Sequence, residues 1–190
     1  MAFRGVAFAA AIVAADAAKG WAPTHCGLDP AHSMTTKWAA EVSPTRVLVE
    51  YPRPLMTRSS LSWKNLNGLW QWESAMCSED GVASPPTPGK ALSGSILVPF
   101  PVEACLSGIG ENHACMHYRL QLGEGELPQA EAGGKTLLHF GAVDWQTEVW
   151  VNGMKVGNNT GGYTAFTIDV TAALASKVKF TGLGHNLGQL

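Results

Sequence analysis

Alternation of polar and apolar residues within short segments constrains the fold of this chain more than any other feature. The segments "GLWQWES", "CMHYRLQL", "WQTEVWV" and "YTAFTIDV" repeat with a period of two, the period of a β-strand. In "VNGMK", Asn152-Gly153 predicts a two-residue hairpin turn, because both residues tolerate positive φ. No segment has a sustained helical period. Several short strands joined by turns predict an all-β domain, a sandwich or jelly roll.

The parity of residues 142–151 predicts two different faces. One face is expected to be buried, and it comprises Val143, Trp145, Thr147, Val149 and Val151. The same burial is expected for Trp70, Trp72, Met116, Tyr118, Leu120 and Phe140. The other face carries Ala142, Asp144, Gln146, Glu148 and Trp150. An aromatic ring beside carboxylates and an amide suits a carbohydrate, but it also suits an interdomain contact or a solvated sheet face.

Catalytic and metal chemistry are not predicted. Four residues along a strand separate the Cα atoms of Asp144 and Glu148 by about 13 Å, whereas glycosidase carboxyl groups lie ~5 to 9.5 Å apart. His113, Cys115 and His117 alternate on one strand face and offer zinc ligands, but no fourth ligand is evident. Phosphate-binding loops, nucleophile elbows and zinc-protease motifs are missing from the sequence. We therefore predict no catalytic residue, no metal and no cofactor.

Residues 1–22 have the layout of a secretory signal peptide. One arginine precedes an apolar run from Val6 to Ala15, and Ala15-Asp16-Ala17 is a small-x-small cleavage site. The alternatives are an alanine-rich organelle leader, a disordered tail, or a cytoplasmic chain. The apolar run is too short to span a bilayer. With a net charge of −2 and 15% charged residues, neither nucleic acid nor a membrane is an expected partner.

The cysteines and one N-glycosylation sequon also bear on whether the chain is secreted. Four cysteines are present, and Cys105 and Cys115 flank the short loop "ACLSGIGENHAC", so this pair is the favoured disulfide. Free, buried thiols are the alternative. Asn158 in "NNT" is an N-glycosylation acceptor if the chain is secreted.

Composition divides the remaining chain. Residues 23–62 contain prolines at 23, 30, 44, 52 and 54 and predict an extended leader. Residues 63–174 hold the alternating segments and predict the folded domain. Residues 175–190 form a tail without such a pattern.

Residues 36–174 resemble the start of glycoside hydrolase family 2 enzymes of the β-galactosidase, β-glucuronidase and β-mannosidase type. The resemblance lies in "EYPRPLMTRSSLSWKNLNGLWQWE", "ILVPFPVEACLSGIG", "MHYRLQL" and "LLHFGAVDWQTEVWVNGMKVGNNTGGYTAF", in the family's order and approximate spacing. It implies a galactose-binding-like jelly-roll sandwich, which acts as the sugar-binding accessory domain beside an immunoglobulin-like domain and a catalytic barrel. A barrel alone needs about 250 residues, so the family's catalytic glutamates cannot be placed here.

The sequence departs from the family at two places. The tail "ASKVKFTGLGHNLGQL" stands where the family has its last strand, which predicts a sandwich that lacks this strand. The family's Gly-Gly-Tyr-x-Pro-Phe becomes Gly161 to Phe166 with Ala165 in place of proline, and Tyr163 and Phe166 are expected to pack. Three functions stay open: an accessory domain contacting β-linked carbohydrate and the family's other domains, a free-standing lectin-like module, or a non-functional truncated fragment.

Overall fold

The computed structural model describes residues 38, 41–47, 62–79, 81, 83, 90–123, 125–127, 132–175 and 183–186. The predicted signal peptide 1–22 and most of the leader 23–62 lie outside these residues. Within the leader, Val47 is buried, and the carbonyl oxygen of Pro44 lies 3.8 Å from the position of a β-carbon built on Gly68. This part of the leader therefore packs on the folded domain.

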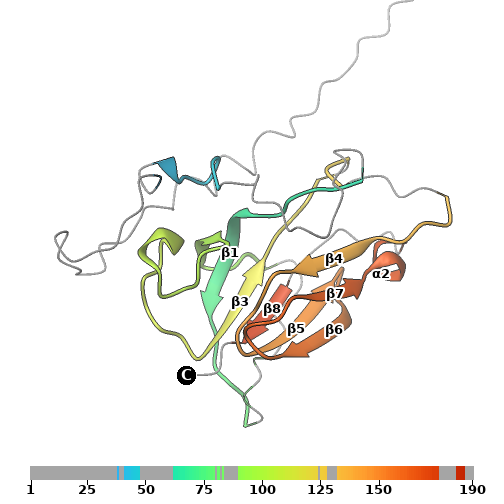
Figure 1. The fold of residues 1–190 in the computed structure, drawn as a ribbon. Helices are drawn as coiled ribbons and strands as arrows, with labels where there is room; N and C mark the ends of the chain where they lie inside the picture. The colour runs from blue at the N-terminus through green and yellow to red at the C-terminus, as the bar shows by residue number, and fades with distance from the viewer. Residues whose placement is uncertain are drawn as a thin grey trace, which may run out of the picture.

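Antiparallel strands make up most of the regular secondary structure among the described residues (Figure 1). The strands are β1 (Gly68–Ser74), β2 (Gly94–Val98), β3 (Cys115–Arg119), β4 (Leu137–Phe140), β5 (Gln146–Val151), β6 (Met154–Thr160), β7 (Phe166–Asp169) and β8 (Leu183–Asn186). The short helices are η3 (Cys105–Ser107) and α2 (Thr171–Ala175). Six strands form one sheet in the order β2-β1-β3-β8-β5-β6, and β4 pairs with β7 in a second sheet.

Strand β8 comes from the tail that resembles no family segment. Its backbone pairs antiparallel with β3, where Met116 is opposite His185, and with β5, where Thr147 is opposite His185. The expectation that the sheet lacks a strand here is therefore not met, because β8 joins β3 to β5. An unpaired strand edge at this position would invite association with other chains.

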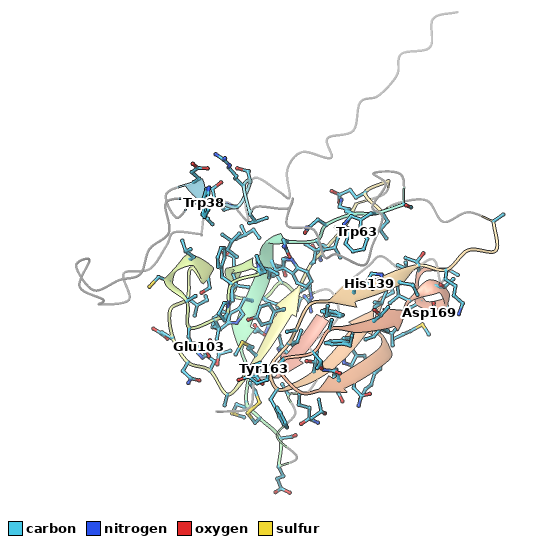
Figure 2. All side chains as sticks on the ribbon, viewed as in Figure 1. Trp38, Trp63, Glu103, His139, Tyr163 and Asp169 are labelled. Atoms are coloured by element: carbon cyan, nitrogen blue, oxygen red, sulfur yellow. A yellow bond between two sulfur atoms is a disulfide. The ribbon has the colours of Figure 1, made fainter. Side chains whose placement is uncertain are left out.

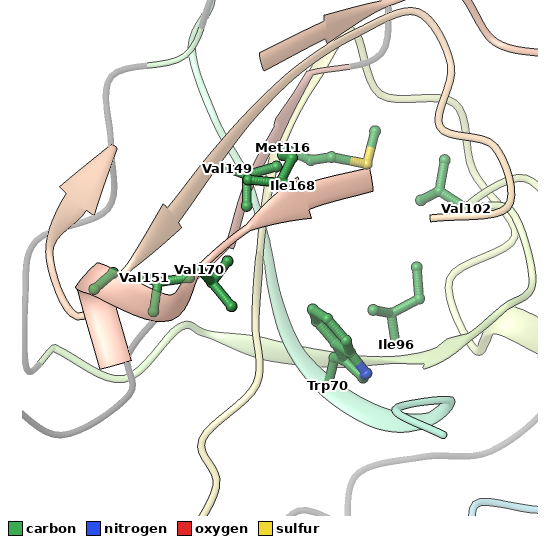
Figure 3. Packing of buried hydrophobic residues seen from close by; sticks show 9 residues of the cluster. Trp70, Ile96, Val102, Met116, Val149, Val151, Ile168 and Val170 are labelled. Atoms are coloured by element: carbon green, nitrogen blue, oxygen red, sulfur yellow. The ribbon is translucent and has the colours of Figure 1, made fainter. Parts of the chain in front are cut away.

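The two sheets enclose one apolar core (Figure 3). The core consists of Trp70, Ile96, Val102, Met116, Val149, Val151, Ile168, Val170 and Ala173. Trp72, Tyr118, Leu120 and Phe140 pack against this core, and the Phe140 and Phe166 rings stack with centroids 4.6 Å apart. The predicted all-β sandwich is confirmed.

Close packing between the sheets requires a glycine in β6. A β-carbon built on Gly157 would lie 2.8 Å from Cδ1 of Ile168 in β7, which is closer than real β-carbons approach. Gly157 therefore faces the second sheet, and the exposed Asn158 next to it points to the opposite side.

The predicted disulfide Cys105–Cys115 is wrong. Cys115 is bonded to Cys77, with the two Cα atoms 5.5 Å apart, and Cys105 belongs to another disulfide. Strand pairing explains the partner: Ser74 is opposite Met116, and the Ala75 N–H donates to the Cys115 carbonyl at 2.9 Å, so the chain leaving β1 passes the start of β3. Backbone bonds such as Gly110 N–H to the Val102 carbonyl, 2.9 Å, hold the loop after η3 instead.

Candidate carbohydrate or interdomain surface

Strand β5 has the two faces that its sequence predicts. Thr147, Val149 and Val151 are buried in the core, while Gln146, Glu148 and Trp150 are half-buried. We call the side of β5 and β6 that carries Gln146, Glu148 and Trp150 the outer face. Three of the four predicted surface residues therefore share one side of the sheet.

The carboxylate of Glu148 on the outer face is already engaged. It forms an ion pair with Lys155 of β6, and the exposed fractions of the two side chains are 18% and 44%. Trp150 is directly opposite Lys155, after a β-bulge between Val149 and Trp150. A lysine and a half-buried ring therefore flank Glu148, which limits its freedom to act as an acid or a nucleophile.

Trp145 was predicted to lie in the core, and this prediction is wrong. The strand begins only at Gln146, so the alternation of β5 does not extend to Trp145, whose side chain is 51% exposed. Tyr163, also expected to pack, is 82% exposed, whereas Phe166 does pack. Tyr163 lies beyond the ends of β5 and β6 in Figure 2.

The segments that carry these two aromatic rings meet at one end of the sandwich. The Gly161 N–H donates to the Trp145 carbonyl at 2.7 Å, and Gly161 has a φ of +117°, which favours glycine. A β-carbon built on Gly162 would lie 2.3 Å from Oδ1 of Asp144. We call the group Asp144, Trp145, Gly161, Gly162 and Tyr163 the aromatic corner. Only the glycine pair in the sequence points to this close approach.

A buried polar cluster on the other half of the six-stranded sheet escaped the sequence reasoning. His117 Nδ1 lies 3.4 Å from Glu73 Oε1, and the buried Arg119 donates to the Lys90 carbonyl. Burial lowers the pKa of Arg119, and Glu73 opposes this shift. The Leu92 N–H also donates to Gln71 Oε1 at 3.2 Å.

These bonds make the cluster a structural support. It ties residues 90–92 to β1 and β3 and leaves Arg119 covered. Alternation in "CMHYRLQL" places His117 and Arg119 on one face, and this was the available signal.

Two of the three residues weighed as zinc ligands, Cys115 and His113, have other partners. The Cys115 sulfur is in a disulfide, and His113 Nδ1 lies 3.1 Å from Ser74 Oγ while its ring contacts Trp72 edge-on at 4.9 Å. Among the described residues, no group of three or more His, Cys, Asp or Glu side chains could hold a metal ion. In the same part of the chain, no helix is long and apolar enough to cross a membrane.

Sequence comparison relates part of the chain to a glycosidase. No family model matches. Over 39 residues the chain is 49% identical to a putative β-glucuronidase of Formosa agariphila, and this match covers 20% of the chain and 5% of that protein.

Solved structures of β-glucuronidases are also similar. The enzyme of Faecalibacterium prausnitzii is 23% identical, with a TM-score of 0.47 over 70% of the chain. The enzyme of Bifidobacterium dentium is 22% identical, with a TM-score of 0.45 over 66% of the chain. The chain spans 22% and 21% of these two proteins. The local sequence match thus supports a relation to glycoside hydrolases over a fraction of their length.

Proposed function

We propose that this chain is the accessory β-sandwich of a glycoside hydrolase of the β-glucuronidase type. The observation that carries the proposal is the 49% identity over 39 residues to a putative β-glucuronidase. The resemblance of residues 36–174 to the first domain of family 2 enzymes, and the all-β sandwich, agree with it.

On this proposal the domain contacts substrate or neighbouring domains and performs no hydrolysis. Glycosidases need two carboxyl groups that flank one glycosidic bond: a protonated one that donates a proton to the leaving oxygen, and an ionised one that acts as nucleophile or base. Here Asp144 precedes β5 and packs against Gly162, whereas Glu148 is paired with Lys155 on the outer face. The two groups are constrained by different neighbours, which does not suit a catalytic pair.

The aromatic corner is the best place for a carbohydrate to dock. Exposed rings pack on the C–H faces of sugars, and a carboxylate accepts hydrogen bonds from their hydroxyl groups. Trp145 and Tyr163 are exposed, and Asp144 lies against the same glycine pair. The half-buried Gln146, Glu148 and Trp150 extend this surface along β5.

Titration of the purified chain with aryl β-glucuronides, β-galactosides and β-mannosides tests the proposal. Few polar contacts leave little affinity after the entropy of association, so we expect a millimolar Kd, about 4 kcal/mol, or weaker. Trp145→Ala and Tyr163→Ala should each weaken binding, whereas Trp38→Ala, at an equally exposed tryptophan, should not. If only Trp150→Ala abolishes binding, the sugar binds at the outer face and not at the aromatic corner.

The exposed pair Trp145 and Tyr163 also favours a second candidate, a free-standing lectin-like module. Such a module must bind sugar without help from another domain. A Kd in the micromolar range for the isolated chain would favour the lectin over the accessory domain.

A further inference from the structure

The outer face bears the single N-x-Ser/Thr sequon of the sequence, Asn158-Asn159-Thr160. All three residues belong to β6, which ends the six-stranded sheet and pairs with β5 alone within it. Asn158 and Thr160 are exposed, and the Asn159 amide instead donates to the Gly161 carbonyl at 3.2 Å. An edge strand leaves room beside Asn158 for a large substituent.

Two observations fix the side to which Asn158 points. Gly157 faces Ile168 and the second sheet, so the next residue along the strand points away from the core. Asn158 is also directly opposite Glu148 in the β5–β6 ladder, which places both on the outer face. Neither observation depends on the sequon.

We propose that Asn158 carries an N-linked glycan that covers the outer face of β5 and β6. The inference goes beyond the proposed accessory-domain role and requires that the chain enter a secretory pathway, as residues 1–22 predict. In the step itself, the Asn158 amide nitrogen bonds to the anomeric carbon of a lipid-diphosphate-linked oligosaccharide. The carbon–oxygen bond to the lipid diphosphate breaks, its electron pair leaves with the diphosphate, and the amide releases one proton.

Side chains of the outer face surround the position of the glycan. Its first sugar starts opposite Glu148, which is paired with Lys155. Trp150 lies two residues further along β5, and such a diagonal neighbour across a ladder is about 7–8 Å away, within reach of a sugar ring. An aromatic ring and a paired charge suit the apolar face and the hydroxyl groups of that sugar. On this inference the glycan occupies the outer face, and the aromatic corner is the surface left for a docked carbohydrate or a neighbouring domain.

The test is expression of the full chain, with its own first 22 residues, in a eukaryotic secretory host. Treatment with peptide-N-glycosidase should lower the mass of the secreted protein by one glycan and convert Asn158 to aspartate in the peptide map. Asn158→Gln and Thr160→Ala should abolish the shift. Thr160→Ser keeps the sequon and should retain it.

Two results would overturn the inference: a wild-type chain whose mass does not change on treatment, or a shift that persists in Asn158→Gln. A second version with a heterologous signal sequence keeps the test decisive if the native leader does not export the chain. If the chain with the heterologous signal sequence is secreted without a glycan, the inference is also overturned. Sugar binding by an unmodified chain would leave the accessory-domain proposal intact, so the two can fail separately.

Discussion

The carboxylate of Asp144 occupies the space that a side chain on Gly162 would need. A β-carbon built on Gly162 lies 2.3 Å from Oδ1, 2.4 Å from Cγ and 2.7 Å from Cβ of Asp144. Together with the bond from Gly161 N–H to the Trp145 carbonyl, this contact joins the start of β5 to the loop after β6. The aromatic corner depends on it.

Gly162→Ala should destabilise the domain by about 1–3 kcal/mol, because the methyl group overpacks the contact with Asp144. Denaturant unfolding measures the loss, and the emission of Trp145 should change with it. In an Asp144→Gly background, which removes all three close atoms, Gly162→Ala should cost less. Equal costs in both backgrounds would show that the contact does not constrain the corner.

Removing the Cys77–Cys115 disulfide should lower the free energy of unfolding by about 4 kcal/mol in the chain-entropy model, since the bond closes a long loop. The sequence separation of the two cysteines is 38. Comparing Cys77→Ser/Cys115→Ser with wild type in denaturant measures the loss. A non-reducing peptide map should recover the 77–115 cross-link, and recovery of 105–115 would contradict the strand register at the end of β1.

Asp169 should make stability depend on pH in the acid range. Hydrogen bonds from the side chain and backbone of Thr171, followed by Lys135, lower the pKa of Asp169 from 3.8 to about 2. A carboxyl group whose pKa is lower in the folded state stabilises that state at pH values above its unfolded-state pKa. This contribution disappears as pH falls from 3.8 to about 2.

The unfolding midpoint temperature of Asp169→Asn should therefore change less between these pH values than that of wild type. Thermal melts at matched ionic strength measure the difference. Parallel curves for the two proteins would show that the carboxylate is not held by Thr171 and Lys135.

The alternation of polar and apolar residues predicts which face of a strand is buried. The alternation of Thr147, Val149 and Val151 gives the correct buried face, because a strand repeats every two residues. The same rule fails at Trp145, because the chain bends there before the ladder starts.

The disulfide pairing and the position of β8 depend on contacts between residues far apart in the sequence. Cys77 meets Cys115 through the register of β1 and β3, and β8 finds its place between β3 and β5 through backbone hydrogen bonds. Neither follows from spacing along the chain. The tight approach of Gly162 to Asp144, next to the exposed Tyr163, also joins separate segments.

Hydrolysis by the purified chain tests the accessory-domain account most directly. The substrates are chromogenic β-glucuronides, β-galactosides and β-mannosides, and Asp144→Asn and Glu148→Gln serve as matched variants that keep the side-chain shapes. The account predicts no release of the chromophore above the uncatalysed rate for wild type or either variant. Turnover by wild type that disappears in Asp144→Asn or Glu148→Gln would contradict it, because the active carboxylates would then lie in this sandwich.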